Sequence, residues 1–286
     1  MQRILLCLDG DPQPSVFDAV VAVDAGVECL LRHGGVKPAD VRNLVYGLMF
    51  TRGVEYLNHS AIFIGGSDAT AVEALLKEAI GSFFGPQRTS VMLDGNGANT
   101  TAAAAVLAVR KHVPLAGSIV AVLGATGAVG RRVVRLLARE GARVRVGSRR
   151  RVHAEGTCDR VAALVPHAEL TPIQTDTPSA AAEALAGAQA VIACGAPGVV
   201  LLDAQGFSAG GSLQAAVDLN AVPPLGIAGI ESSDKAKVRH GAACYGALGV
   251  GGTKMKIHKR AIAKLFTAND LVLDAEEIYA LGKELG

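Results

Sequence analysis

The sequence of 286 residues has no tryptophan, only 4% aromatic residues and five cysteines. The cysteines are Cys7, Cys29, Cys158, Cys194 and Cys244. Because they are odd in number, widely spaced and without a C-x-x-C pair, they predict neither a disulfide framework nor a zinc site. We therefore expect reduced thiols, no bound metal and a cytoplasmic location.

A long uninterrupted apolar run and an excess of one charge sign are also lacking. Ala184–Leu202 carries no charged residue, but Gly187, Gly195 and Pro197 interrupt it, so we expect a buried strand and a loop rather than a membrane helix. The first apolar run ends at Asp9 without a small-residue cleavage site, which favours a buried strand over a signal peptide. With 28 Lys+Arg against 26 Asp+Glu, the net charge of +2 argues against bulk binding of nucleic acid or membranes.

What the chain does contain is enough apolar residues, 50%, for a large core, arranged as strands alternating with helices. We expect strands at 3–8, 61–64, 89–93, 118–123, 142–146, 190–194, 215–219 and 241–245. We expect helices at 16–27, 68–83, 102–111 and 131–140, and two more within 260–286. This order predicts an α/β protein with two open parallel-sheet domains, the second of them a Rossmann nucleotide-binding domain. Pro114 and Gly117 mark the boundary, so the expected domains are 1–113 plus 262–286, and 114–261.

A glycine-rich turn lies between the strand 118–123 and the helix that follows it. Its sequence, Gly-Ala-Thr-Gly-Ala-Val-Gly, is a variant of the dinucleotide fingerprint, in which glycines permit a tight turn, close approach of the pyrophosphate and helix packing. The expected nucleotide-binding residues are Gly124, Thr126, Gly127, Ala128, Val129 and Gly130. The alternative is a structural turn in a Rossmann-like domain that has lost its ligand.

The next predicted strand ends in Ser148, Arg149 and Arg150, where an NAD site usually carries Asp or Glu for the ribose hydroxyls. A hydroxyl and guanidinium groups suit a 2′-phosphate, so we expect NADP, with NAD accepted less well. The window Arg131–Arg151 holds nine arginines and one acid, which favours recognition of a small phosphate-bearing ligand. The alternative is a solvated arginine loop.

Three tracts together resemble the bacterial methylene-tetrahydromethanopterin dehydrogenases. They are Asp94–Thr101 (DGNGANTT), Asp218–Ile227 (DLNAVPPLGI) and Tyr245–Lys256 (YGALGVGGTKMK). The resemblance extends from Ser15 to Tyr279, nearly the whole chain, and is nearer to the NADP-dependent form that also acts on methylene-tetrahydrofolate. It implies a pterin-binding domain, a Rossmann domain and hydride transfer in the cleft between them, which converts N5,N10-methylene-tetrahydromethanopterin to the methenyl form in formaldehyde oxidation and one-carbon metabolism. It also implies a homo-oligomer built on trimers.

Polar residues at the ends of two predicted strands are candidates for the site. Asp94, Asn96, Asn99 and Thr100 follow the third strand, where ligands bind in open α/β sheets, and are expected to contact substrate. The alternative is that they cap the next helix. Asp218, as a substrate contact, and Asn220, near the nicotinamide, have turn formation as their alternative.

The resemblance favours a catalytic lysine after Gly251-Gly252, and we expect Lys254 to be the principal one, with Lys256 second. The alternative is a solvated helix face shared with Lys259. The seven histidines have no ligand spacing and are expected to be ordinary surface or core residues.

Two rival functions remain at this point. One is a carbonyl reductase similar to shikimate dehydrogenase, which needs a Lys/Asp pair that Lys37 and Lys77 do not obviously form. The other is a non-catalytic NADP-sensing protein.

Overall fold

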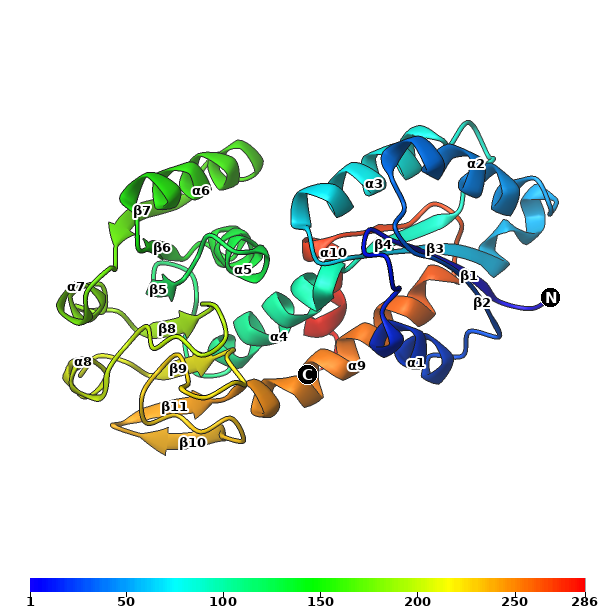
Figure 1. Cartoon of the computed structure of the whole chain (residues 1–286). Coiled ribbons are helices and arrows are strands. Elements are labelled where there is room, and N and C mark those ends of the chain that lie inside the picture. The colour runs from blue at the N-terminus through cyan, green and yellow to red at the C-terminus, as the bar shows by residue number, and fades with distance from the viewer. Residues whose placement is uncertain (286) are drawn as a thin grey trace. The chain divides into compact units, whose positions relative to one another are not determined.

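A computed structural model describes residues 1–285, which form two compact units (Figure 1). The first comprises residues 1–100 and those from 255 on, and the second residues 101–254. Helices α4 (Ala98–Arg110) and α9 (Ala247–Leu265) each contain one of the two boundaries. The boundaries expected from the sequence fall after α4 and inside α9.

The first unit is built on five parallel strands in the order β12-β4-β3-β1-β2. The strands are β1 (Ile4–Asp9), β2 (Cys29–His33), β3 (Ser60–Gly65), β4 (Ser90–Leu93) and β12 (Val272–Leu273). This is the order of flavodoxin-like doubly wound sheets, in which the chain winds outward in both directions from β1 and β3. Every residue of the central strand β3 is buried, as expected for a strand covered on both faces.

Helices cover both faces of this first sheet (Figure 1). They are α1 (Val16–Asp24), α2 (Pro38–Met49), α3 (Ala69–Gly81) and α10 (Ala275–Lys283), with 3₁₀ turns at η1 (Val54–His59) and η2 (Gly95–Gly97). The buried side chains of α2 and α3, among them Val45 and Leu75, pack on Ile62 and Leu6 of the sheet to form the core.

The second unit contains seven strands in the order β10-β11-β9-β8-β5-β6-β7. The strands are β5 (Ile119–Leu123), β6 (Arg143–Ser148), β7 (Glu169–Gln174), β8 (Ala190–Ala193), β9 (Ala215–Asp218), β10 (Lys235–Arg239) and β11 (Ala242–Tyr245). Six neighbouring strands, in the spatial order β7-β6-β5-β8-β9-β11, are parallel and have the 3-2-1-4-5-6 order of a Rossmann fold. Strand β10 is an added antiparallel edge strand that pairs with β11. The predicted fold class, two open parallel α/β sheets with a Rossmann domain second, is confirmed.

The helices of the second unit besides α4 are α5 (Ala128–Arg139), α6 (Arg151–Leu164), α7 (Pro178–Glu183) and α8 (Ala204–Ala209). Three predicted helices start too late. Helix α4 begins at Ala98 rather than 102, α5 at Ala128 rather than 131, and α9, of which only the end was expected within 260–286, at Ala247. The first part of each is formed by the polar or glycine-rich tract before the expected start. The uncharged stretch 184–202 contains β8 and loops, and no described helix is long and apolar enough to cross a membrane.

Candidate functional site

A pocket of about 400 Å³ lies at the carboxyl ends of β5, β6 and β8 in the second unit. This is where the strand order of a Rossmann sheet reverses and where its ligands bind. The turn after β5, the end of β6, the start of the β7–α7 loop and the loop after β8 line it. The lining residues are Gly124, Thr126, Gly127, Ser148, Arg149, Thr175, Cys194, Gly195, Ala196, Val199 and Leu201.

The three glycines of the turn serve different purposes. Gly124 has φ +69°, and a Cβ there would lie 2.8 Å from the Cα of Gly195. A Cβ on Gly130 would lie 2.7 Å from the backbone of Ala125, so this glycine lets α5 pack closely on the turn. A Cβ on Gly127 would meet nothing within 4 Å. The space beside Gly127 is therefore open.

Gly127 is also the N-cap residue of α5 and supplies no side-chain cap. The amides of the first turn of α5, together with the helix dipole, suit an anion at this end of the helix. The open position at Gly127 fits the pyrophosphate of a dinucleotide, which needs close approach to the backbone. Ala128, Val129 and Gly130 form the first turn, as expected for residues that present amides to it.

A second pocket of about 410 Å³ adjoins the first. It is lined by Thr126, Ser148, Arg149, Arg150 and His153, of which Thr126, Ser148 and Arg149 also line the first pocket. Ser148 ends β6, and α6 begins directly after Arg150. Among the residues that the structure describes, no Asp or Glu lines either pocket. The donors gathered here fit a phosphate better than a pair of ribose hydroxyls.

The other arginines of the window Arg131–Arg151 require a correction, because several of them bind the backbone elsewhere. Arg139 donates to the carbonyl of Leu164, Arg143 to that of Gly117 at 3.0 Å, and Arg145 to those of Ala184 and Ala186 at 2.8 and 2.7 Å. These guanidinium groups satisfy carbonyls at the ends of helices and loops. The local charge of the window thus does not mark a single phosphate site, and only Arg149 and Arg150 line the pockets.

Asp218 and Asn220 order the loop after β9. The two oxygens of Asp218 accept the amides of Asn220 at 3.0 Å and Ile227 at 2.9 Å, and Asn220 itself binds Pro224 and Val222. Burial raises the pKa of the Asp218 carboxyl above its usual value, against the opposing effect of its backbone hydrogen bonds. These bonds match the turn-forming alternative, and the expected contacts of both residues with substrate and nucleotide stay predictions.

In the first unit, Asp94 and Thr100 cap α4. Asp94 Oδ1 accepts the amides of Asn99 and Thr100 at 2.8 and 3.1 Å, and its Oδ2 accepts the Thr100 hydroxyl at 2.7 Å. Asp94, Asn99 and Thr100 are fully buried. Asn96 differs from them, because it is exposed and has a left-handed backbone with φ 49°. Of these four residues, Asn96 is thus the one whose side chain is open to a ligand.

Lys254 and Lys256 lie inside α9, where Lys254 is half-buried and Lys256 exposed. Residues two apart on a helix point about 200° away from each other. The two lysines therefore cannot both approach the same substrate atom from this helix.

Comparison with known proteins decides the family. Residues 16–96 match the family described as methylene-tetrahydromethanopterin dehydrogenase, N-terminal, and residues 124–271 match an NAD(P)H-binding family. The chain is 42% identical to the "Bifunctional protein MdtA" of Methylorubrum extorquens over 286 residues, 99% of each chain. It is 31% identical to the NAD(P)-dependent methylenetetrahydromethanopterin dehydrogenase of the same organism, over 95% of this chain and 94% of the other. The chain belongs to the methylene-tetrahydromethanopterin dehydrogenase family.

Among solved structures, the shikimate 5-dehydrogenase of Listeria monocytogenes in complex with shikimate and NAD is similar, with a TM-score of 0.59. The identity is 13%, over 100% of this chain and 96% of that one, so the likeness is one of fold alone. Membership of the methylene-tetrahydromethanopterin dehydrogenase family confirms the resemblance stated from the sequence tracts. The rival function similar to shikimate dehydrogenase is not supported.

Six of the ten predicted nucleotide residues line the two pockets, and their contacts with a nucleotide stay predictions. The six are Gly124, Thr126, Gly127, Ser148, Arg149 and Arg150, whereas Ala128, Val129, Gly130 and Asn220 line neither pocket. Lining residues that the sequence does not reveal include Thr175, Cys194 and Gly195, which come from strand ends far along the chain, and His153, which has no ligand spacing. The positions after β7 and β8 could have been found from the predicted strand order, because those ends meet at the nucleotide edge.

Proposed function

We propose that this protein is a dehydrogenase that transfers a hydride from N5,N10-methylene-tetrahydromethanopterin to NADP⁺ and gives the methenyl form. It would also act on methylene-tetrahydrofolate and serve formaldehyde oxidation in one-carbon metabolism. The observation that carries the proposal is family membership over nearly the whole chain, together with an NAD(P)H-binding unit whose glycine turn is open at Gly127.

The chemistry places modest demands on the protein. The methylene carbon lies between two nitrogens whose lone pairs assist hydride departure, so catalysis is chiefly positioning and electrostatics. When bound, the nicotinamide ring supplies the hydride acceptor. The chain would bind the pyrophosphate with the first-turn amides of α5, and the 2′-phosphate with Ser148, Arg149 and Arg150.

On the substrate side, we place the exposed Asn96 and Lys254 of α9 among the groups that orient the pterin, with Lys256 as the second candidate. A lysine near the one-carbon bridge would hold a pterin heteroatom, although a cation opposes the developing methenyl charge. The protein would act in the cytoplasm as a homo-oligomer built on trimers. Analytical ultracentrifugation tests the oligomeric state.

Turnover of the purified full chain tests the function. The two methylene pterins are each combined with NADP⁺ and NAD⁺, and the methenyl absorbance is followed. We expect turnover with methylene-tetrahydromethanopterin, faster with NADP⁺ than with NAD⁺. Absence of the methenyl product in all four combinations would overturn the proposal. If NADP⁺ still bound in that case, the non-catalytic alternative would replace it.

A further inference from the structure

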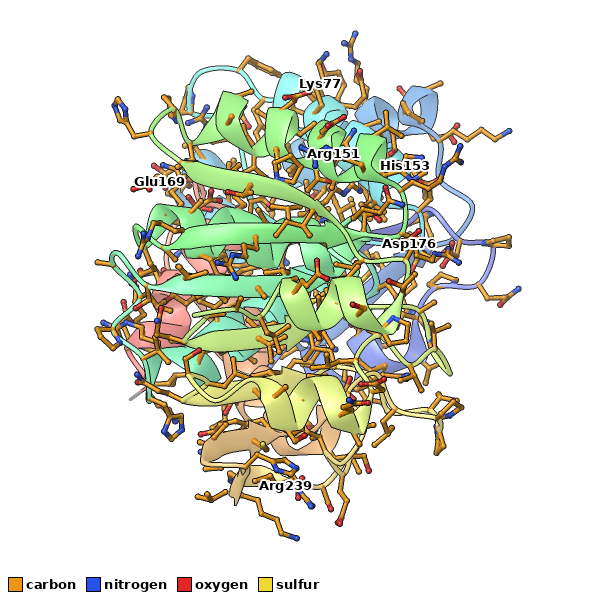
Figure 2. All side chains as sticks on the ribbon, turned by 90° about the vertical axis from the view of Figure 1, so that its left-hand side faces the viewer. Lys77, Arg151, His153, Glu169, Asp176 and Arg239 are labelled. Carbon is orange, nitrogen blue, oxygen red and sulfur yellow. The ribbon has the colours of Figure 1, made fainter. Side chains whose placement is uncertain are left out.

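His153 is the third residue of α6 and lies at the carboxyl edge of the Rossmann sheet. Figure 2 shows it on the same side as Asp176, which follows the carboxyl end of β7, and opposite Glu169, which begins that strand. The side chain is exposed, and His153 lines the second pocket together with Arg149, Arg150 and Ser148.

The ring of His153 is available to a ligand. Within residues 1–285 it makes no hydrogen bond or ion pair, since only its backbone is engaged, with Arg150 and Thr157. Its neighbour Arg151 differs, because a 3.0 Å ion pair holds that guanidinium against Glu155 on the same helix. Arg151 also lines neither pocket.

The second pocket is lined by donors of several kinds. Arg149 and Arg150 contribute guanidinium groups, Ser148 and Thr126 hydroxyls, and His153 an imidazole, and the first turn of α6 starts beside them. Guanidinium and imidazole N–H groups at a helix N-terminus are the donors that bind phosphate. The pocket also lies where the second strand of a Rossmann sheet ends, which is the position of the ribose 2′ group rather than of the pyrophosphate.

We infer that His153 is a specificity-determining residue that donates a hydrogen bond to the 2′-phosphate of NADP. The inference extends the proposed function, because it assigns a further contact within the NADP site. His153 lines the second pocket and not the first, which extends toward the loop after β8, so we expect it to contact the 2′-phosphate and to favour NADP over NAD.

Equilibrium binding to the full chain tests this assignment without any turnover. The ligands are adenosine 2′-monophosphate and adenosine 5′-monophosphate, with NADP⁺ and NAD⁺ as the complete nucleotides, and binding is measured by calorimetry. The variants are His153→Ala and His153→Gln, which keeps an N–H donor. His167→Ala is the matched control, because His167 is an exposed histidine just beyond the other end of α6 and lines neither pocket.

We expect His153→Ala to weaken binding of the 2′-monophosphate and of NADP⁺ about tenfold, the loss of one hydrogen bond to a charged group. Binding of NAD⁺ and the 5′-monophosphate should stay within about twofold, since neither carries the 2′-phosphate that the lost hydrogen bond served. His153→Gln should recover part of the loss, and His167→Ala should match the wild type. Unchanged binding of the 2′-monophosphate in His153→Ala, or equal weakening of both monophosphates, would overturn the inference.

The outcomes separate this inference from the proposed function. A wild-type protein that turns over neither pterin but binds the 2′-monophosphate in a His153-dependent way would overturn the function and support the inference. The reverse outcome is turnover of methylene-tetrahydromethanopterin with NADP⁺ and an unchanged preference for NADP⁺ in His153→Ala. It would support the proposed function and overturn the inference.

Discussion

The side-chain amide of Asn99 donates a 2.9 Å hydrogen bond to Oδ1 of Asp274, 175 residues further along the chain. The same amide nitrogen donates to the carbonyl of Leu93 at the end of β4, and Asp274 is the N-cap residue of α10. One buried side chain therefore joins β4, the start of α4 and the start of α10 within the first unit. This gives Asn99 a structural role at the position where the sequence predicts a substrate contact.

Replacement of Asn99 by Ala should lower the free energy of unfolding by about 1–3 kcal/mol, because it leaves the Leu93 carbonyl and Asp274 without this donor. Urea unfolding of the full chain measures the change. Asn96→Gly is the control, since Asn96 is exposed and its left-handed backbone suits glycine. A variant of Asn99 with wild-type stability and a raised KM for the pterin would instead return Asn99 to the substrate interpretation.

Two substitutions in the glycine turn should affect different properties, one the binding of NADP⁺ and the other the stability of the fold. Gly127→Val places its side chain in the open space beside the turn, so we expect at least about tenfold weaker NADP⁺ binding. The loss of stability should be no more than about 1 kcal/mol, the cost of a poorer N-cap residue. Gly130→Ala sets a Cβ 2.7 Å from the backbone of Ala125, so it should destabilise the fold by about 1–3 kcal/mol. Calorimetry measures the affinity of both variants for NADP⁺, and thermal unfolding measures their stability. Tight NADP⁺ binding by a folded Gly127→Val protein would place the pyrophosphate elsewhere.

Five of the seven strands of the nucleotide unit could be predicted, among them β5, β8 and β9, which are short buried runs and almost wholly apolar. Strands β7 and β10 were not expected, because most of their residues are only partly buried or exposed. Strand β2 could not, because it is an edge strand with three exposed residues and carries Arg32 and His33. Helix α2 was missed although Pro38 begins it and the Asp40 carboxylate accepts the amide of its N-cap residue Lys37 at 3.0 Å. Local signals thus reveal central strands well and peripheral elements poorly, since the latter depend on packing against parts of the chain that sequence periodicity does not show.

Paired arginines should set the nucleotide preference. The double replacement of Arg149 and Arg150 by Ala removes two charged donors from the second pocket, so KM for NADP⁺ should rise by about a hundredfold or more and that for NAD⁺ little. Arg151→Ala is the control, because its guanidinium is held by Glu155. Steady-state kinetics with both nucleotides provides the comparison. A similar rise for NADP⁺ and NAD⁺ would remove the 2′-phosphate assignment.

The β10–β11 hairpin gives a pH-dependent prediction. Asp234 accepts two hydrogen bonds from Arg239, at 2.6 and 2.9 Å, and this guanidinium holds the pKa of the Asp234 carboxyl below its usual value. The ionised pair therefore stabilises the fold above about pH 4, the ordinary range of an Asp, and this contribution is lost as the pH falls through the lower folded value.

Asp234→Asn should be less stable than the wild type by about 1–3 kcal/mol at pH 7, because Arg239 loses its charged partner. The difference between the two proteins should persist to about pH 5 and shrink below pH 4. Urea unfolding at a series of pH values measures it. The control is Glu231→Gln, whose exposed carboxylate also contacts Arg239 and should matter by less than about 1 kcal/mol. A constant difference down to pH 3 would contradict the assignment.

Much of the lining of the two pockets could be predicted from the sequence because it comes from two short tracts, Gly124–Gly127 and Ser148–Arg150. The substrate contacts were harder to predict from the sequence. Asp94 and Thr100 are polar residues of the types that bind ligands, but they form hydrogen bonds with each other, and Asp94 also accepts amides of α4. Residue type and spacing are equally compatible with ligand binding and with helix capping, and only the direction of the side chain distinguishes the two roles.

The two candidate catalytic lysines, Lys254 and Lys256, point in different directions from α9. Because Lys254 and Lys256 point about 200° apart on the helix, replacement by Ala should affect turnover at one position only. We expect Lys254→Ala to lower kcat with the methylene pterin at least about tenfold and to leave NADP⁺ binding unchanged, and Lys256→Ala to keep wild-type kcat. Lys254→Arg, which keeps the charge, tests whether the cation or its position matters. Wild-type kcat in Lys254→Ala would assign this lysine to the solvated helix face, and a loss confined to Lys256→Ala would move the catalytic role to that residue.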